Sequence, residues 1–149
     1  MRFLSILLVI AACGKDSSSK PEPGTGGVTT KKPCEYMARG DAEAALELKL
    51  PNTNEGTPPG ECDYMTAEFY GAALGMGTWD GAKMAASSGH PKPVAGVGDE
   101  ALWIGRGHLY VRKGDAGFLI AINGPAVDAL PDEGLAKAKT LALTILAKM

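Results

Sequence analysis

The clearest alternation of hydrophobic and polar positions lies in residues 101–123. Three short apolar runs there, rich in β-branched and aromatic residues, are separated by two turn signals. Gly114-Asp115 suits a two-residue turn with glycine at the position that needs a positive φ, which places Val111 opposite Phe118 on the next strand. The pattern predicts a three-stranded antiparallel meander in the C-terminal half of the chain.

The two faces of this meander differ in character. Its first turn uses Arg106-Gly107 or Gly105-Arg106, and both keep every side chain on its face because the two registers differ by two residues. One face is apolar and is expected to be the core face, whereas the other is half aromatic. The apolar face holds Leu102, Ile104, Leu109, Val111, Phe118, Ile120 and Ile122, and the second face holds Trp103, His108, Tyr110, Arg112, Leu119 and Ala121.

An apolar stripe at helical spacing follows near the C-terminus. It predicts a helix over residues 131–148, which begins at Pro131 and carries two acidic residues in its first turn. We expect this stripe to pack on the apolar face of the meander. The stripe consists of Leu135, Ala138, Leu141, Ala142, Ile145 and Met149.

Shorter patterns predict the other elements. Residues 38–48 are rich in helix formers, and residues 78–88 indicate a second short helix with Thr78 as its N-cap. Residues 61–66 predict a strand with Cys62 and Tyr64 on one face, after a loop at 51–60. Residues 67–77 fit either a strand broken by glycines or an irregular helix. The expected fold class is therefore α+β, with one antiparallel sheet and helices packed on it.

The N-terminus begins with the positive pair Met1-Arg2 and an apolar run of about ten residues, too short to span a bilayer as a helix. The run ends in Ile10-Ala11-Ala12-Cys13, which resembles the lipobox of bacterial lipoproteins. In that family the cysteine thiol receives a diacylglycerol and a peptidase cuts before it. The resemblance implies a signal peptide over residues 1–12 and lipidation of Cys13. The alternatives are a plain secretory signal in which the cysteine is coincidental, or a buried N-terminal strand.

Composition divides the remainder of the chain. Residues 13–32 carry Cys13 and a Ser-, Gly-, Pro- and Lys-rich stretch without apolar periodicity, which predicts a flexible tether. Residues 33–149 then form a single α+β domain. A formal net charge of -2 gives no basic footprint for nucleic acid. The expected location is outside the cytoplasm, anchored to a membrane through the N-terminal lipid, at the outer membrane or facing the periplasm in a cell with two membranes.

The chain has three cysteines. If Cys13 is lipidated, Cys34 and Cys62 remain as a pair in an oxidising compartment, which favours a disulfide. A metal site is the weaker alternative, because these two thiols lack a CxxC spacing and the chain has only two histidines.

Three segments together resemble a known group of proteins. They are Cys34 followed by a helix, then Cys62-Asp63-Tyr64, and then VAGVGDEA, residues 94–101, entering a strand. This arrangement resembles small secreted bacterial lipoproteins of uncharacterised function, and it is similar to the extracellular sensor domain of PknH-type receptor kinases. The resemblance implies an α+β domain with helices on one antiparallel sheet and no established catalytic residues.

The sequence contains no motif that indicates catalysis or cofactor binding in the structural context that such a motif requires. Gly96-x-Gly98-x-x-Ala101 matches a dinucleotide fingerprint in letters, but prolines precede it and a strand pattern, not a helix, follows. His90 and His108 are far apart in the chain and fit surface positions better than metal ligands. We therefore expect no metal, no cofactor and no enzymatic activity; a site assembled in space from distant residues is the remaining alternative.

The second face of the meander is the candidate binding face. Trp103, Tyr110 and Leu119 are predicted to form a row across its strands, with His108 and Arg112 beside them. One interpretation is a docking surface for a peptide, a glycan or an envelope protein, since Trp, Tyr and Arg are common anchors. The other is that a helix covers the row as a second core in a passive structural lipoprotein. The exposure of Trp103 and Tyr110 distinguishes them.

Overall fold

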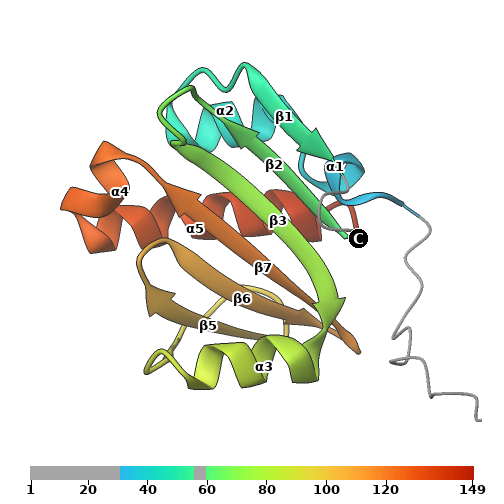
Figure 1. Cartoon of the computed structure of the whole chain (residues 1–149). Helices are drawn as coiled ribbons and strands as arrows, with labels where there is room; N and C mark the ends of the chain where they lie inside the picture. Colours follow the sequence, from blue (N-terminus) through green and yellow to red (C-terminus); the bar gives the residue numbers. More distant parts are fainter. Residues whose placement is uncertain (1–30, 56–59) are drawn as a thin grey trace, which may run out of the picture.

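A computed structural model describes residues 31–55 and 60–149 and shows a seven-stranded antiparallel sheet with helices on both faces (Figure 1). The strand order is β1-β2-β3-β7-β6-β5-β4. The α+β class is therefore confirmed. The elements are α1 (Pro33–Tyr36), α2 (Arg39–Leu46), β1 (Asn52–Glu55), β2 (Glu61–Met65), β3 (Gly71–Thr78), α3 (Trp79–Ser87), β4 (Lys92–Pro93), β5 (Glu100–Gly105), β6 (His108–Lys113), β7 (Ala116–Asn123), α4 (Pro125–Ala129) and α5 (Pro131–Leu146).

Most predicted elements are present, and two predictions change. The segment left open at 67–77 resolves into a short loop and the long strand β3. The predicted loop at 51–60 was partly wrong, because residues 52–55 form the edge strand β1. The sequence of this strand, Asn-Thr-Asn-Glu, shows no alternation of apolar and polar residues. It forms a strand because its main chain pairs with one neighbour, β2, at the edge of the sheet. The helices α1 and α4 were not predicted.

The core face of the sheet is the one that α5 covers. Side chains of β5, β6 and β7 on this face pack against α5, and α1 and α2 cover the neighbouring strands β2 and β3. The predicted stripe of α5 is buried at Ala138, Leu141, Ala142 and Ile145, whereas Leu135 is partly buried and Met149 is 40% exposed. The predicted docking of this helix on the apolar face is thus confirmed for the strands β6 and β7.

A disulfide joins Cys34 in α1 to Cys62 in β2, with their Cα atoms 5.2 Å apart. Cys62 is fully buried on the core face, beside the helix that opens the domain. The predicted pairing of these two cysteines is confirmed. The bond fixes α1 against the sheet, together with the buried Tyr36 of the same helical turn.

A β-bulge in β5 corrects the predicted faces of the meander. Gly105 pairs with His108, as the Arg106-Gly107 turn requires, but Trp103 pairs with Leu109, so Ile104 has no partner residue. One extra residue shifts the register by one and exchanges the two faces of the strand. Trp103 therefore lies in the main core, 6% exposed, whereas Leu102 and Ile104 lie on the opposite face.

The opposite face, here called the open face, is covered only in part. Helix α3 leaves the end of β3 and carries the chain toward β4 at the far edge, crossing over β7, β6 and β5 (Figure 1). Trp79 and Ala86 of this helix form a second small core with Tyr110, and Leu119 packs against it. The predicted aromatic binding row is therefore not exposed: Tyr110 is 7% exposed beneath α3, and Trp103 is on the other face.

Trp103→Ala is expected to lower the free energy of unfolding by about 3–5 kcal/mol, the range for a buried aromatic side chain cut to alanine. Chemical denaturation measures the loss. Met84→Ala is the matched control, because Met84 is 74% exposed on α3 and its truncation should change stability by less than about 0.5 kcal/mol. Equal effects of the two substitutions would contradict the placement of Trp103 in the core.

Replacing both Cys34 and Cys62 by alanine is expected to cost about 3.5 kcal/mol, because the bond closes a loop across a sequence separation of 28 residues in the unfolded chain. Denaturation of the variant, compared with oxidised wild-type protein, measures this loss, and reduced wild-type protein should lose a similar amount. A reduced wild type as stable as the oxidised protein would show that the bond does not hold the domain together.

Candidate functional site

The part of the open face that α3 leaves uncovered is a shallow trough with a floor of small residues. Asp63 on β2, Ala73 on β3, Ala121 on β7 and His108 on β6 are direct cross-strand neighbours, so they form one row across four adjacent strands. Side chains in such a row share one face of the sheet. The two alanines leave the space between Asp63 and His108 unfilled.

This space is a hollow of about 160 Å³, here called the open-face hollow. It lies where β2 ends, β3 begins and β6 begins, between the β2–β3 loop and the β5–β6 turn (Figure 1). Its size is about half the lower limit for sites that enclose drug-sized molecules. The residues that give it chemical character are Asp63, Phe69, Arg106, His108 and Asn123, over the floor of Ala73 and Ala121.

The β2–β3 loop forms one wall and presents Phe69 to solvent. The ring is 73% exposed, and the residue has a φ of 65°, which is uncommon for a bulky side chain. The loop is fixed by Thr66, whose Oγ1 accepts hydrogen bonds from the N–H groups of Glu68 and Tyr70. Asn123 fixes it from β7 by donating to the carbonyl oxygen of Phe69 at 2.9 Å. Phe69 is thus held outward by a well-bonded loop.

The β5–β6 turn forms the other wall and carries Arg106. Its three residues, Gly105, Arg106 and Gly107, all have positive φ values. Only glycine fits at 107, because a Cβ there would lie 1.7 Å from the carbonyl oxygen of Ile122. The carbonyl oxygen of Gly107 accepts a hydrogen bond from the N–H of Ile122 at 2.8 Å. The turn is therefore closely attached to β7, which fixes where the Arg106 side chain begins.

Asp63 is the half-buried acid of the hollow. Its Oδ1 atom is buried and accepts no hydrogen bond from any residue that the structure describes. Burial raises the pKa of this carboxyl group above its ordinary value. A carboxylate oxygen in this position gains free energy from any donor or cation that approaches it, since an unpaired buried acceptor is costly.

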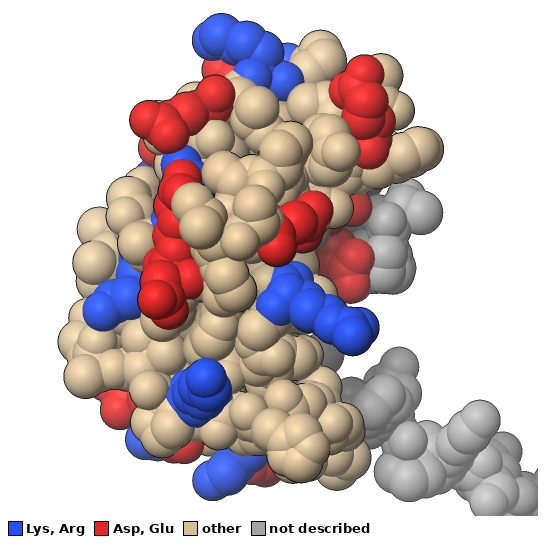
Figure 2. Space-filling view, turned by 90° about the vertical axis from the view of Figure 1, so that its left-hand side faces the viewer, with Lys and Arg blue, Asp and Glu red and all other residues tan. Residues whose placement is uncertain are grey.

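Among the residues that the structure describes, three ionisable side chains around the hollow have no charged partner. Within residues 31–55 and 60–149, Asp63, Arg106 and His108 take part in no ion pair or side-chain hydrogen bond. Figure 2 looks onto the left side of Figure 1 and shows acidic and basic side chains interspersed, without an extended patch of either sign. The hollow can therefore offer a hydrogen-bond acceptor on one side and cationic or donor groups on the other.

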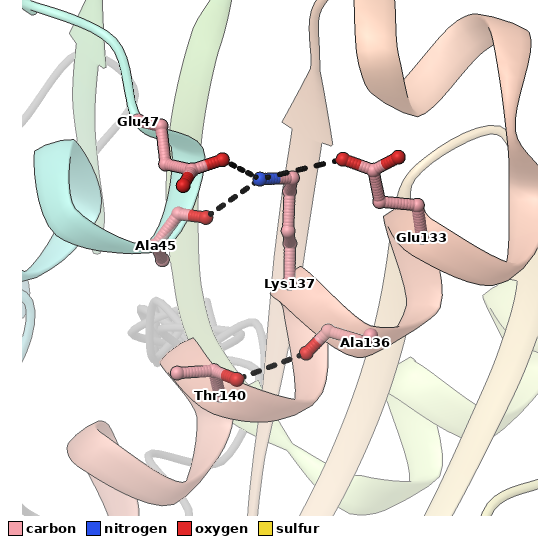
Figure 3. A network of polar contacts seen from close by, with 6 residues as sticks. All are labelled: Ala45, Glu47, Glu133, Ala136, Lys137 and Thr140. Atoms are coloured by element: carbon pink, nitrogen blue, oxygen red, sulfur yellow. Dashed lines mark hydrogen bonds and ion pairs between the residues drawn. The ribbon is translucent and has the colours of Figure 1, made fainter.

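A second polar cluster, around Lys137 on α5, differs from the hollow because its charged groups are paired with one another (Figure 3). Its Nζ atom lies 2.9 Å from Glu47 Oε2 and 3.6 Å from Glu133 Oε1, and it also donates to the carbonyl oxygen of Ala45. The hydrogen bond to Glu47 is the main cause that raises the pKa of Lys137 and lowers the pKa of Glu47. This cluster attaches α5 to the end of α2 and is structural.

The five residues of the predicted binding face lie in different environments in the structure. Only His108 borders the hollow. Tyr110 and Leu119 pack under α3, and Arg112 forms an ion pair with Glu100 at 3.6 Å and lies over the Trp79 ring. Trp103 is on the core face. Cys13, the predicted lipidation site, lies outside the described residues.

Sequence reasoning missed Asp63, Phe69 and Arg106. Asp63 had a usable signal, because it alternates with Cys62 and Tyr64 and so had to point away from the core. Phe69 lay in the segment whose secondary structure was left open, and Arg106 was counted only as a turn residue. The approach of Asp63 and Phe69 to His108 depends on the pairing of β3 with β7, which joins segments about 50 residues apart.

The segment around Gly98 is structural. A Cβ at this position would lie 2.3 Å from the carbonyl oxygen of Arg112, and strand β5, not a helix, follows it. This confirms that the segment is no dinucleotide fingerprint. In the described part of the chain no three His, Cys, Asp or Glu side chains are grouped to hold a metal, and no helix there has the length and apolarity to cross a bilayer.

Comparisons of the chain with protein-family models, with curated proteins and with solved structures each gave no match. The function is therefore argued from the site and the sequence.

Asp63→Asn is expected to leave the protein at least as stable as wild type at neutral pH. Folding raises the pKa of Asp63, so the wild type loses stability as the pH rises through that raised value, whereas the neutral amide does not. The difference should vanish at low pH, where Asp63 is protonated in both states. Denaturation between pH 3 and 8 measures it.

Asp99→Asn is the matched control with the opposite sign. The Gly114 N–H donates to Asp99 Oδ2 at 2.7 Å and is the main cause that lowers the pKa of Asp99. Its stabilising contribution is present above the unfolded-state pKa and is lost as the pH falls through the folded-state value. The asparagine variant should therefore be less stable than wild type at neutral pH only. If both asparagine variants changed the stability at neutral pH in the same direction, the environments assigned to Asp63 and Asp99 would be contradicted.

Proposed function

We propose that the chain is a lipid-anchored extracytoplasmic protein whose single domain binds a small ligand, or one residue of a larger one, in the open-face hollow. The observation that carries the binding role is the grouping of Asp63, Arg106 and His108, without charged partners among the described residues, beside the exposed ring of Phe69. The lipobox at Ile10-Ala11-Ala12-Cys13 supports the anchor. The Cys34–Cys62 disulfide agrees with an oxidising compartment.

The position of the hollow suits an anchored protein. The described chain enters at α1, which the disulfide fixes near the start of β2, and Lys31 there donates a hydrogen bond to the carbonyl oxygen of Lys148 near the C-terminus. The hollow lies at the other end of the strands, beside Met65 at the end of β2. Figure 1 shows this end of β2 away from α1. A tether at the first end would leave the hollow accessible.

The geometry favours binding over catalysis. Asp63 and His108 are separated by two intervening strands, so their backbones lie about 14 Å apart at about 4.8 Å per strand. A nucleophile and its base, or a base and its orienting acid, need to be within direct hydrogen-bond reach. The same separation allows two opposite charges to contact the two ends of one ligand.

A passive structural lipoprotein is the second candidate. The observation in its favour is the coverage of Tyr110 and Leu119 by α3, which removes the aromatic docking surface. The two candidates share the lipid anchor and differ only in whether the open-face hollow takes a ligand.

The anchor is tested by Cys13→Ser. The substitution is expected to abolish incorporation of labelled palmitate and to leave unprocessed precursor, because only a thiol can accept the lipid as a thioether. Ser19→Ala, within the predicted tether, is the matched control and should be processed and labelled like wild type. Unchanged cleavage of the Cys13→Ser protein, or an unlabelled wild type, would overturn the anchor.

A further inference from the structure

We propose that the open-face hollow binds an extended ω-amino carboxylate, with the ligand's ammonium beside Asp63 and its carboxylate beside Arg106 and His108. This inference rests on the proposed binding function and names its ligand class. The shared chemistry is a single residue-sized group with an apolar middle and opposite charges at its two ends. A free ω-amino acid and the C-terminal lysine of a peptide both carry it.

The charges of the hollow set the polarity and the length of the ligand. The acid stands at the β2 end of the cross-strand row, whereas His108 and the neighbouring Arg106 stand at the β6 end. The backbones at these ends are about 14 Å apart, and side chains stand roughly perpendicular to a sheet. Two charge-assisted hydrogen bonds of about 2.8 Å each then leave about 9 Å between the ligand's charged groups. Glycine is too short to reach both ends, whereas a chain of five methylene groups is suitable.

The middle of the hollow is apolar. Ala73 and Ala121 form the floor between the two charged ends, and they offer methyl groups and no free donor or acceptor side chain. Phe69 stands at the rim with 73% of its surface exposed. Methylene groups lying over this floor would be removed from water, and burial of apolar surface favours binding. A sugar or a compact polyanion would instead place polar groups over the alanines.

The cost of leaving Asp63 unpaired provides the driving force at one end. Its Oδ1 atom is buried with no donor from the described residues, and a nearby ammonium would favour the ionised carboxylate. At the other end, a carboxylate can accept two parallel hydrogen bonds from one guanidinium. The closely bonded β5–β6 turn holds the base of the Arg106 side chain in place for this contact.

The test is calorimetric titration of the mature full-length protein, in detergent, with 6-aminohexanoate. Hexanoate and hexylamine, which keep the chain and one charge each, are the matched ligands. The zwitterion is expected to bind at least about tenfold more tightly than either, a difference of about 1.4 kcal/mol. A peptide ending in lysine and its C-terminal amide separate the two sources of the ligand. A free-acid peptide that binds more tightly than both its amide and 6-aminohexanoate indicates a chain end. Tighter binding of 6-aminohexanoate than of the free-acid peptide indicates a free amino acid.

Variants then locate the site. Asp63→Asn and Arg106→Gln should each weaken binding of 6-aminohexanoate about tenfold or more, and Ala121→Leu should abolish it by filling the floor. Asp115→Asn and Lys83→Gln remove exposed charges elsewhere and should bind like wild type. Thermal unfolding of each variant establishes that it is folded.

The outcomes separate the ligand class from the binding function. If hexanoate or hexylamine binds as tightly as the zwitterion and Ala121→Leu abolishes that binding, the hollow is a ligand site but the proposed ligand class is wrong. If 6-aminohexanoate and the lysine peptide both fail to bind, the ligand class is overturned. Unchanged binding to Ala121→Leu would show that the ligand sits elsewhere and would overturn both the class and the hollow as the binding site.

Discussion

The seven-stranded sheet has two faces, and the described helices cover one of them and only part of the other. Successive side chains along each strand lie on opposite faces of the sheet. One residue added to or removed from a strand therefore moves all following side chains to the other face. Helices α1, α2, α4 and α5 bury the core face, which the Cys34–Cys62 disulfide also fixes. Of the described helices, α3 alone lies on the open face, and its course from β3 to β4 decides how much of this face the helices cover.

The uncovered part of the open face differs from an ordinary solvated sheet. Polar strand faces in contact with water usually carry long charged side chains, yet here alanines occupy the centre of the row between Asp63 and His108. The loop that presents Phe69 and the turn that presents Arg106 are both secured by main-chain hydrogen bonds. Chargeable groups without partners within the described part of the chain are thus held on well-fixed walls around a small apolar floor. Such an arrangement is better suited to recognition than to stability.

Much of the fold followed from local patterns. The pairing of Val111 with Phe118 came from the Gly114-Asp115 turn, the helix over residues 131–146 from its apolar spacing, and the disulfide from cysteine count. The face of Trp103 could not be predicted, because the bulge at Ile104 has no sequence signature and one residue reverses the strand. The hollow could not be predicted either, since it depends on the long-range pairing of β3 with β7 and on the course of α3.

If α3 covers the aromatic part of the open face and leaves the hollow accessible, footprinting of the native protein with hydroxyl radicals should distinguish the two regions. We expect strong labelling of Phe69, which is 73% exposed, and protection of Tyr110 and Trp103, which are 7% and 6% exposed. Unfolded protein supplies the full labelling of each side chain for comparison. Labelling of Tyr110 or Trp103 as strong as that of Phe69, or protection of Phe69, would contradict the account.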